Sequence, residues 1–80
     1  MKNNMIVYRE LNNELNELSL KIKKLSDLKY VDTITYLKLG SEMCCLLDIQ
    51  LQIMKSYQEV LLARMTLLRK YMSEEVTFYE

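Results

Sequence analysis

Residues 41–72 read SEMCCLLDIQLQIMKSYQEVLLARMTLLRKYM, a run that contains neither glycine nor proline. Such a run favours one uninterrupted helix, because these two residues are the strongest breakers of helices. Ser41 can cap the start of the helix, and the adjacent Glu42 suits the positive end of its dipole. The pattern predicts a helix over about residues 41–72, followed by an acidic tail over 73–80 that is either a disordered end or a short docking segment.

Apolar residues cover more than half of the circumference of this helix. One row consists of Met43, Leu47, Met54, Leu61 and Leu68, and the other of Leu46, Ile49, Ile53, Val60, Ala63 and Leu67. The charged residues of the remaining strip are Asp48, Lys55, Glu59 and Lys70. A helix of this kind has to be covered on two sides. One neighbour within the chain covers one side only, so the second row predicts an interface with another molecule.

An earlier stretch of the chain supplies the first neighbour. Its apolar residues, spaced by alternating steps of three and four, are Tyr8, Leu11, Leu15, Leu18, Ile22 and Leu25. This spacing is the heptad pattern of a coiled coil, and its flanks are polar. The sequence therefore predicts a helix over about residues 3–29 that presents one narrow apolar face.

Residues 30–40 connect the two predicted helices and contain Gly40, the only glycine of the chain. The β-branched residues in this connector lower its helix propensity. We expect a turn with an extended or short helical segment, whose apolar residues cap the end of the core; these are Val31, Ile34, Leu37 and Leu39. The predicted fold is all-α, a single antiparallel helical hairpin over residues 1–80.

A hairpin of 80 residues needs further stabilisation. An ordering cost of roughly 1.5 kcal/mol per residue brings a lone two-helix unit close to zero net stability. A metal is not expected, because the chain has no histidine and the adjacent Cys44 and Cys45 cannot share a tetrahedral site. Nor do neighbouring cysteines bridge separate segments, so we expect buried, reduced thiols. Self-association through the second row is the remaining source of stabilisation. The sequence therefore predicts a helical-bundle homo-oligomer without cofactor or metal.

Composition argues against several classes of function. The 11 basic and 11 acidic residues cancel, which disfavours non-specific binding of nucleic acid. No apolar run approaches the roughly 18 residues that span a membrane, and the first residues lack the apolar core of a secretion signal. A cytoplasmic protein is expected. Without a histidine, a glycine-rich phosphate loop or a base beside any serine, no enzymatic activity is predicted.

Three hydrogen-bonding residues, Gln50, Tyr57 and Arg64, recur at intervals of seven on the long helix, and Met54 lies among them. Burying such groups without a partner costs about 1–3 kcal/mol each. In one interpretation the first helix satisfies them. Gln50 then comes level with Lys21, Tyr57 with Glu14, and Arg64 with Tyr8, Glu10 or Leu11. In the other they line a groove between protomers, where arginine binds a phosphate or carboxylate and tyrosine stacks on a base.

The same positions carry a resemblance that covers about 55 residues. The matching residues of the long helix are Leu46-Leu47, Gln50-Leu51, Met54, Tyr57, Val60-Leu61 and Arg64-Met65. Those of the first helix are Arg9-Glu10-Leu11 and Lys21-Ile22-Lys23-Lys24-Leu25. The pattern resembles a widespread group of short, bacteriophage-encoded helical-hairpin proteins of mostly unassigned function. The chain departs from that group in its connector, which is longer and less polar.

The resemblance implies a phage accessory factor that opposes host defence without being an enzyme. Some small phage proteins of this kind are oligomers that bind nucleotide-derived immune signals without cleaving them, and others bind a host protein. The resemblance thus implies a small anionic ligand at Gln50, Tyr57, Arg64 and Met54. The alternatives are a module that binds a host protein and a structural coiled-coil component of a phage assembly.

Overall fold

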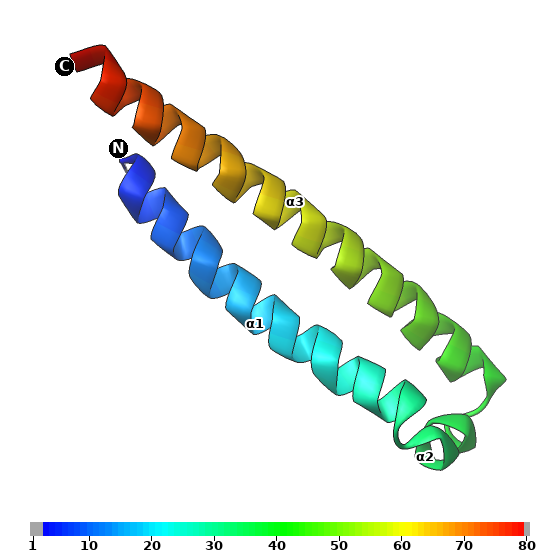
Figure 1. Ribbon diagram of the computed structural model, residues 1–80. Helices are drawn as coiled ribbons and strands as arrows, with labels where there is room; N and C mark the ends of the chain where they lie inside the picture. The colour runs from blue at the N-terminus through cyan, green and yellow to red at the C-terminus, as the bar shows by residue number, and fades with distance from the viewer. Residues whose placement is uncertain (1–2, 80) are drawn as a thin grey trace.

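The computed structural model describes the backbone of residues 3–79 and the side chains of residues 3–74. It contains three helices, α1 (Asn4–Tyr30), α2 (Thr33–Lys38) and α3 (Ser41–Tyr79). The long helices α1 and α3 lie side by side and antiparallel, and α2 joins them at one end (Figure 1). The molecule measures 60 × 22 × 15 Å. The prediction of an all-helical chain with two long helices is confirmed.

Local hydrogen bonds define both ends of α1. The side chain of Asn3 accepts a hydrogen bond of 2.9 Å from the backbone N–H of Ile6, which caps the start of the helix. At the other end, the backbone N–H groups of Val31 and Asp32 both donate to the carbonyl of Asp27 at 2.9 Å. The chain therefore turns away directly after Tyr30.

The connector is helical over Thr33–Lys38. The hydroxyl of Thr33 donates to the carbonyl of Lys29 at 2.9 Å, so a β-branched residue here ties α2 to the end of α1. Gly40 follows with a φ of 92°, a backbone conformation that favours glycine, and its N–H donates to the carbonyl of Leu37 at 3.3 Å. Gly40 thus ends α2 and allows α3 to begin at once.

The apolar residues of the connector do not cap the core, and that prediction was wrong. The exposed ones are Val31, Ile34, Leu37 and Leu39, with Val31 the most exposed at 80%. Only Tyr36 is buried in this segment, at 5% exposure. A six-residue helix places only part of its circumference against the hairpin, and Tyr36 occupies that part. We call residues 31–40 the hairpin tip.

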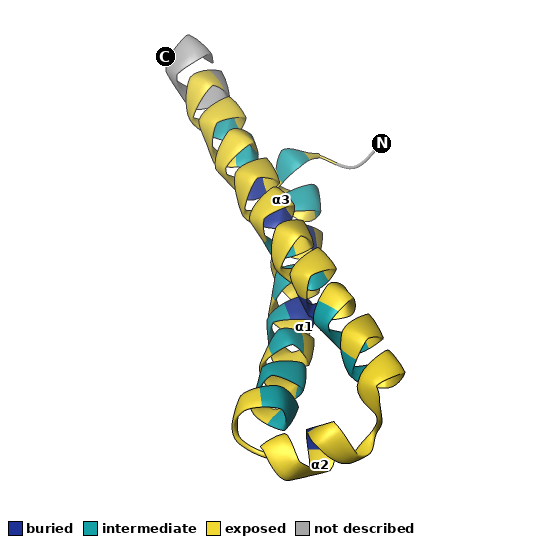
Figure 2. Ribbon diagram, turned by 90° about the vertical axis from the view of Figure 1, so that its right-hand side faces the viewer, coloured by how far each residue is buried: buried dark blue, intermediate teal, exposed yellow. Residues whose placement is uncertain are grey.

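The core is a single narrow layer between α1 and α3 (Figure 2). Leu11 and Leu18 of α1 are buried against Leu61 and Met65 of α3. On α3 the core-facing positions again alternate in steps of three and four, and we call them the inner seam: Leu47, Leu51, Met54, Gln58, Leu61, Met65, Leu68 and Met72. The heptad positions predicted for α1 all lie at least partly buried. Met43, expected on the same row of α3, is instead 48% exposed.

The helix α3 continues past its expected end at residue 72 and reaches Tyr79. Residues 73–79 of the predicted tail are therefore helical, since no glycine or proline interrupts them. The side chains of Phe78 and Tyr79, considered for a docking role, lie outside the described residues. In the part of the chain that is described, none of the helices combines the length and apolar character needed to cross a bilayer.

Candidate functional site

A second heptad series of α3 faces away from α1. We call it the outer seam, and its members are Leu46, Ile49, Ile53, Ser56, Val60, Ala63 and Leu67. All seven residues are exposed, Ile53 at 63%. At 3.6 residues per turn the centres of the two seams lie about 150° apart around the helix. The residues predicted for an interface are therefore on the surface, opposite the side that α1 covers.

A groove between α1 and α3 lies near the hairpin tip. We call it the lysine groove, and its lining residues are Lys21, Lys24, Leu25, Leu28, Gln50 and Met54. Its volume is about 340 Å³. Among the side chains described, neither lysine takes part in a hydrogen bond or an ion pair. The groove therefore combines an apolar floor with two available positive charges and an amide.

The next polar position along α3, Tyr57, contacts α1 directly. Its hydroxyl donates a hydrogen bond to Glu14, the residue expected to lie level with it. This bond, reinforced by partial desolvation, raises the pKa of the Tyr57 hydroxyl, against a smaller opposing effect from Arg64. For Tyr57, satisfaction by the first helix is the arrangement that the structure shows.

Arg64 lies farther along, in a separate groove. We call it the arginine groove, and its lining residues are Val7, Leu11, Arg64, Leu67, Leu68 and Tyr71. It is smaller, about 190 Å³. Leu67 belongs to both this groove and the outer seam. The four residues predicted to bind a ligand are thus divided: Gln50 and Met54 line one groove, Tyr57 bonds to Glu14, and Arg64 lines another.

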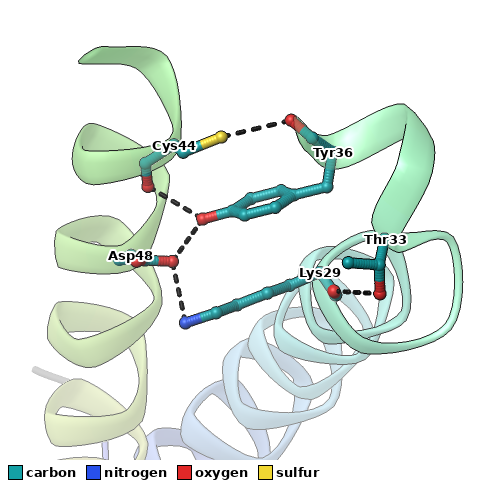
Figure 3. A network of polar contacts seen from close by, with 5 residues as sticks. All are labelled: Lys29, Thr33, Tyr36, Cys44 and Asp48. Carbon is teal, nitrogen blue, oxygen red and sulfur yellow. Dashed lines mark hydrogen bonds and ion pairs between the residues drawn. The ribbon is translucent and has the colours of Figure 1, made fainter. Parts of the chain in front are cut away.

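A network of polar contacts joins the hairpin tip to α1 and α3 (Figure 3). The hydroxyl of Tyr36 donates to Asp48 and also lies 2.8 Å from the carbonyl of Cys44. Asp48 in turn forms an ion pair of 2.8 Å with Lys29 of α1. The Cys44 thiol donates to the carbonyl of Tyr36 at 3.1 Å. All three helices are therefore connected through one carboxylate and one phenol.

The charges of this network stabilise one another. The hydrogen bond from Lys29, followed by that from Tyr36, lowers the pKa of the Asp48 carboxyl despite partial desolvation. The same carboxylate, as hydrogen-bond acceptor, is the main reason that the pKa of the Tyr36 hydroxyl is raised. It also raises the pKa of Lys29. The network is therefore built around an ionised Asp48 and a protonated Tyr36.

The two cysteines differ in their surroundings. Both are free, and Cys44 is half-buried in the network whereas Cys45 is exposed. The expectation of two buried thiols was therefore wrong for Cys45, because adjacent residues of a helix point about 100° apart and only one of them can face the tip.

Comparison with protein families gives a match over most of the chain. The matching family model is that of Sequestin, and it covers residues 7–67. The chain belongs to the Sequestin family. The Sequestin match contains every lining residue of the lysine groove, the whole hairpin tip and the whole outer seam. Comparison with curated proteins and with solved structures found no match.

The roles of several residues in this Sequestin chain were not predicted from the sequence. Lys21 had been placed level with Gln50, but Lys24 had not been assigned to the groove. Asp48 had been grouped with the charged strip, whereas it is the centre of the tip network. Tyr36 carried no local signal of its role, because its partners lie 8 and 12 positions away and depend on how α2 is oriented.

Proposed function

We propose that this member of the Sequestin family is a non-enzymatic binding protein that sequesters a small, nucleotide-derived immune signal. In this proposal it is a phage accessory protein that acts as an oligomer in the host cytoplasm and so counters host defence. The observation that carries the proposal is the lysine groove, where Gln50, apolar side chains and two lysines that have no partner among the described side chains come together. The family name supports a role in holding a ligand rather than converting it.

The groove offers each chemical part of a nucleotide a matching surface. The ammonium groups of Lys21 and Lys24 attract phosphate, and their separation by less than one helical turn places both on the same rim. Leu25, Leu28 and Met54 supply apolar surface on which a base can lie, and the Gln50 amide offers both a donor and an acceptor. The volume of about 340 Å³ falls within the range of small-molecule sites.

Assembly completes the site in this proposal. The groove of a single chain is open, and Gln50 is adjacent along α3 to Ile49 of the outer seam. A second copy bound to the outer seam therefore places its own side chains beside the groove. Enclosure between copies would lower the local dielectric and strengthen the attraction between lysine and phosphate.

Binding is tested with the purified protein and a panel of cyclic nucleotides and ADP-ribose-type compounds. We expect one of them to raise the melting temperature in proportion to the logarithm of its concentration. After the protein is denatured, the compound should be recovered intact, because the proposal includes no cleavage. A panel that leaves the melting temperature unchanged, or a ligand that is recovered hydrolysed, would contradict the proposal.

The site is tested by a charge-matched pair of variants. Lys21→Ala combined with Lys24→Ala should weaken binding at least tenfold. Lys23→Ala combined with Lys55→Ala also removes two charges, from exposed lysines that do not line the groove, and should change binding less than twofold. Arg64→Ala reports on the arginine groove. If it removes binding while the lysine variants retain it, the ligand site lies there, and the assignment to the lysine groove is wrong.

The exposed hairpin tip favours a second candidate function, the binding of a host protein. Ile34, Leu37 and Met43 are all exposed apolar residues in or beside this short segment, and a helical partner can pack against such a surface. A single host protein recovered in a one-to-one ratio, and lost on Ile34→Asp, together with no response to the ligand panel, would favour this function over sequestration.

A further inference from the structure

We infer that the outer seam binds a second copy of this chain, with the two α3 helices parallel and in register as a two-stranded coiled coil. In this arrangement the orientation of the two helices is set by one type of charge pair. It does not depend on the ligand or on the lysine groove, so it can be tested on the protein alone.

The outer seam has the pattern of a dimerisation surface. Its steps of three and four continue without a break from Leu46 to Leu67, and Ser56 is its only polar member. In heptad notation Leu46, Ile53, Val60 and Leu67 are a positions, and Ile49, Ser56 and Ala63 are d positions. The β-branched Ile53 and Val60 occupy central a positions, where such residues suit a two-stranded coiled coil. Since α1 lies about 150° away around α3, a second α3 can reach the seam unobstructed.

Charge complementarity selects the partner and the orientation. The residues that flank the outer seam are Gln50, Tyr57 and Arg64 at e positions and Cys45, Gln52, Glu59 and Thr66 at g positions. In a parallel pair each g residue faces the e residue five positions later in the other helix. Glu59 of one copy then faces Arg64 of the other, twice per dimer. No like charges meet at the remaining flanking positions.

The opposite orientation lacks this pairing. In an antiparallel pair, e residues face e residues and g residues face g residues, so Glu59 and Arg64 never meet. The one acidic and the one basic residue that flank the outer seam are both exposed in a single chain, and neither forms a hydrogen bond or ion pair with a described side chain. A second copy in parallel register gives each of them a partner.

Disulfide trapping tests the geometry. In a background with Cys44→Ser and Cys45→Ser, Ala63→Cys places the thiols of the two copies opposite each other at a d layer near one end of the seam, where an antiparallel pair would hold them apart. We expect it to form a covalent dimer under mild oxidation at least tenfold faster than Lys55→Cys, an exposed position outside the seam. Rates that are equal for the two variants would overturn the parallel, in-register arrangement, whatever the ligand experiments give.

Charge reversal tests the pair that sets the orientation. Glu59→Arg should raise the dissociation constant of the dimer by roughly threefold to tenfold, since two exposed ion pairs are replaced by repulsion. Combining Glu59→Arg with Arg64→Glu should restore it to within about twofold of the original. Glu17→Arg, a charge change at an exposed position of α1, is the control. If the double variant dimerises no better than Glu59→Arg alone, the two residues do not face each other.

Discussion

The phenol of Tyr36 holds α2 against α3 because its hydroxyl reaches two groups one helical turn apart, the Cys44 carbonyl and the Asp48 carboxylate. A hydroxyl has one proton to donate, and the charged carboxylate is the stronger acceptor of the two. Asp48 also pairs with Lys29, so the position of the hairpin tip depends on these few polar contacts together with the burial of the Tyr36 ring. Residues at such positions tolerate even small chemical changes poorly.

The pH dependence of stability follows from the pKa shifts in this network. The pKa of the Asp48 carboxyl is lowered from 3.8 by its bonds with Lys29 and Tyr36, so its contribution to stability is present above 3.8 and is lost as the pH falls. The pKa of the Tyr36 hydroxyl is raised from 10.0 by Asp48, so its contribution is present below 10.0 and is lost as the pH rises. The tip is therefore most stable between these limits.

Replacing Tyr36 with phenylalanine tests this network. Tyr36→Phe should lower the melting temperature at pH 8 by a few degrees, because Asp48 loses a donor while the ring remains. The original chain should lose more stability than the variant between pH 8 and pH 11, since only the original has the Tyr36 proton to release on unfolding. Thermal unfolding at both pH values measures the difference. Tyr30→Phe, which changes an exposed ring, is the control, and an equal effect from it would contradict the assignment.

At the scale of the element, α3 is a helix with two apolar faces, one packed on α1 and one that we propose binds a second copy. Its inner seam packs on α1 and includes the fully buried Leu51 and Leu61, whereas its outer seam is exposed throughout. Between them, on the side where the grooves lie, the spacing of seven places Gln50, Tyr57 and Arg64 at the edge of both seams. From this edge Tyr57 bonds to Glu14 of α1, and in the proposed dimer all three residues lie within reach of the second copy.

Two adjacent leucines of α3 allow a core position to be compared with a surface position. Leu61→Ala should destabilise the chain by about 2–5 kcal/mol, because it removes a fully buried side chain from the layer between α1 and α3. Leu62→Ala removes the same atoms from a position that is 49% exposed and lies on neither seam, so its effect should stay within about 0.5 kcal/mol. Chemical denaturation of both variants at one protein concentration gives the comparison. Equal losses of stability would mean that the inner seam is not the core.

At the scale of the whole molecule, the chain is long and thin, 60 Å by 15 Å in its extreme dimensions, and its core is one side chain deep. Such a shape leaves much of α3 in contact with solvent (Figure 2). Hydrophobic burial scales with the apolar area removed from water, and a single hairpin removes little. Pairing through the outer seam is the way in which two copies would bury more.

Stability should therefore depend on protein concentration. If folding and association are coupled, each tenfold increase in concentration adds about 1.4 kcal/mol to the stability of a dimer and raises its melting temperature. Ile53→Asp, which introduces a charge at the centre of the outer seam, should lower the melting temperature and make it independent of concentration. Thermal unfolding at protein concentrations that span about a hundredfold range, with sedimentation of each sample, measures both effects. A folded monomer throughout this range would exclude assembly through the outer seam.

Periodicity and the single glycine were sufficient to predict two long helices, the core-facing residues of α1 and the level of Tyr57 beside Glu14. These features depend on spacing along the chain, and the heptad repeat determines which residues of one helix share a face. The limits of the elements were less predictable. The β-branched residues of the connector disfavour helix locally, but bonds to the end of α1 and the burial of Tyr36 outweigh that preference.

The arrangement of the candidate site depends on tertiary packing more than the two long helices do. The sequence placed Gln50, Met54, Tyr57 and Arg64 on one strip, yet in the tertiary structure Gln50 and Met54 line one groove, Arg64 lines another and Tyr57 bonds to Glu14 of α1. Likewise, the network of Lys29, Tyr36 and Asp48 brings together three helices whose relative orientation no local pattern specifies. Repeats encode which face a residue occupies, whereas contacts between elements depend on how far each helix is rotated and where the chain turns.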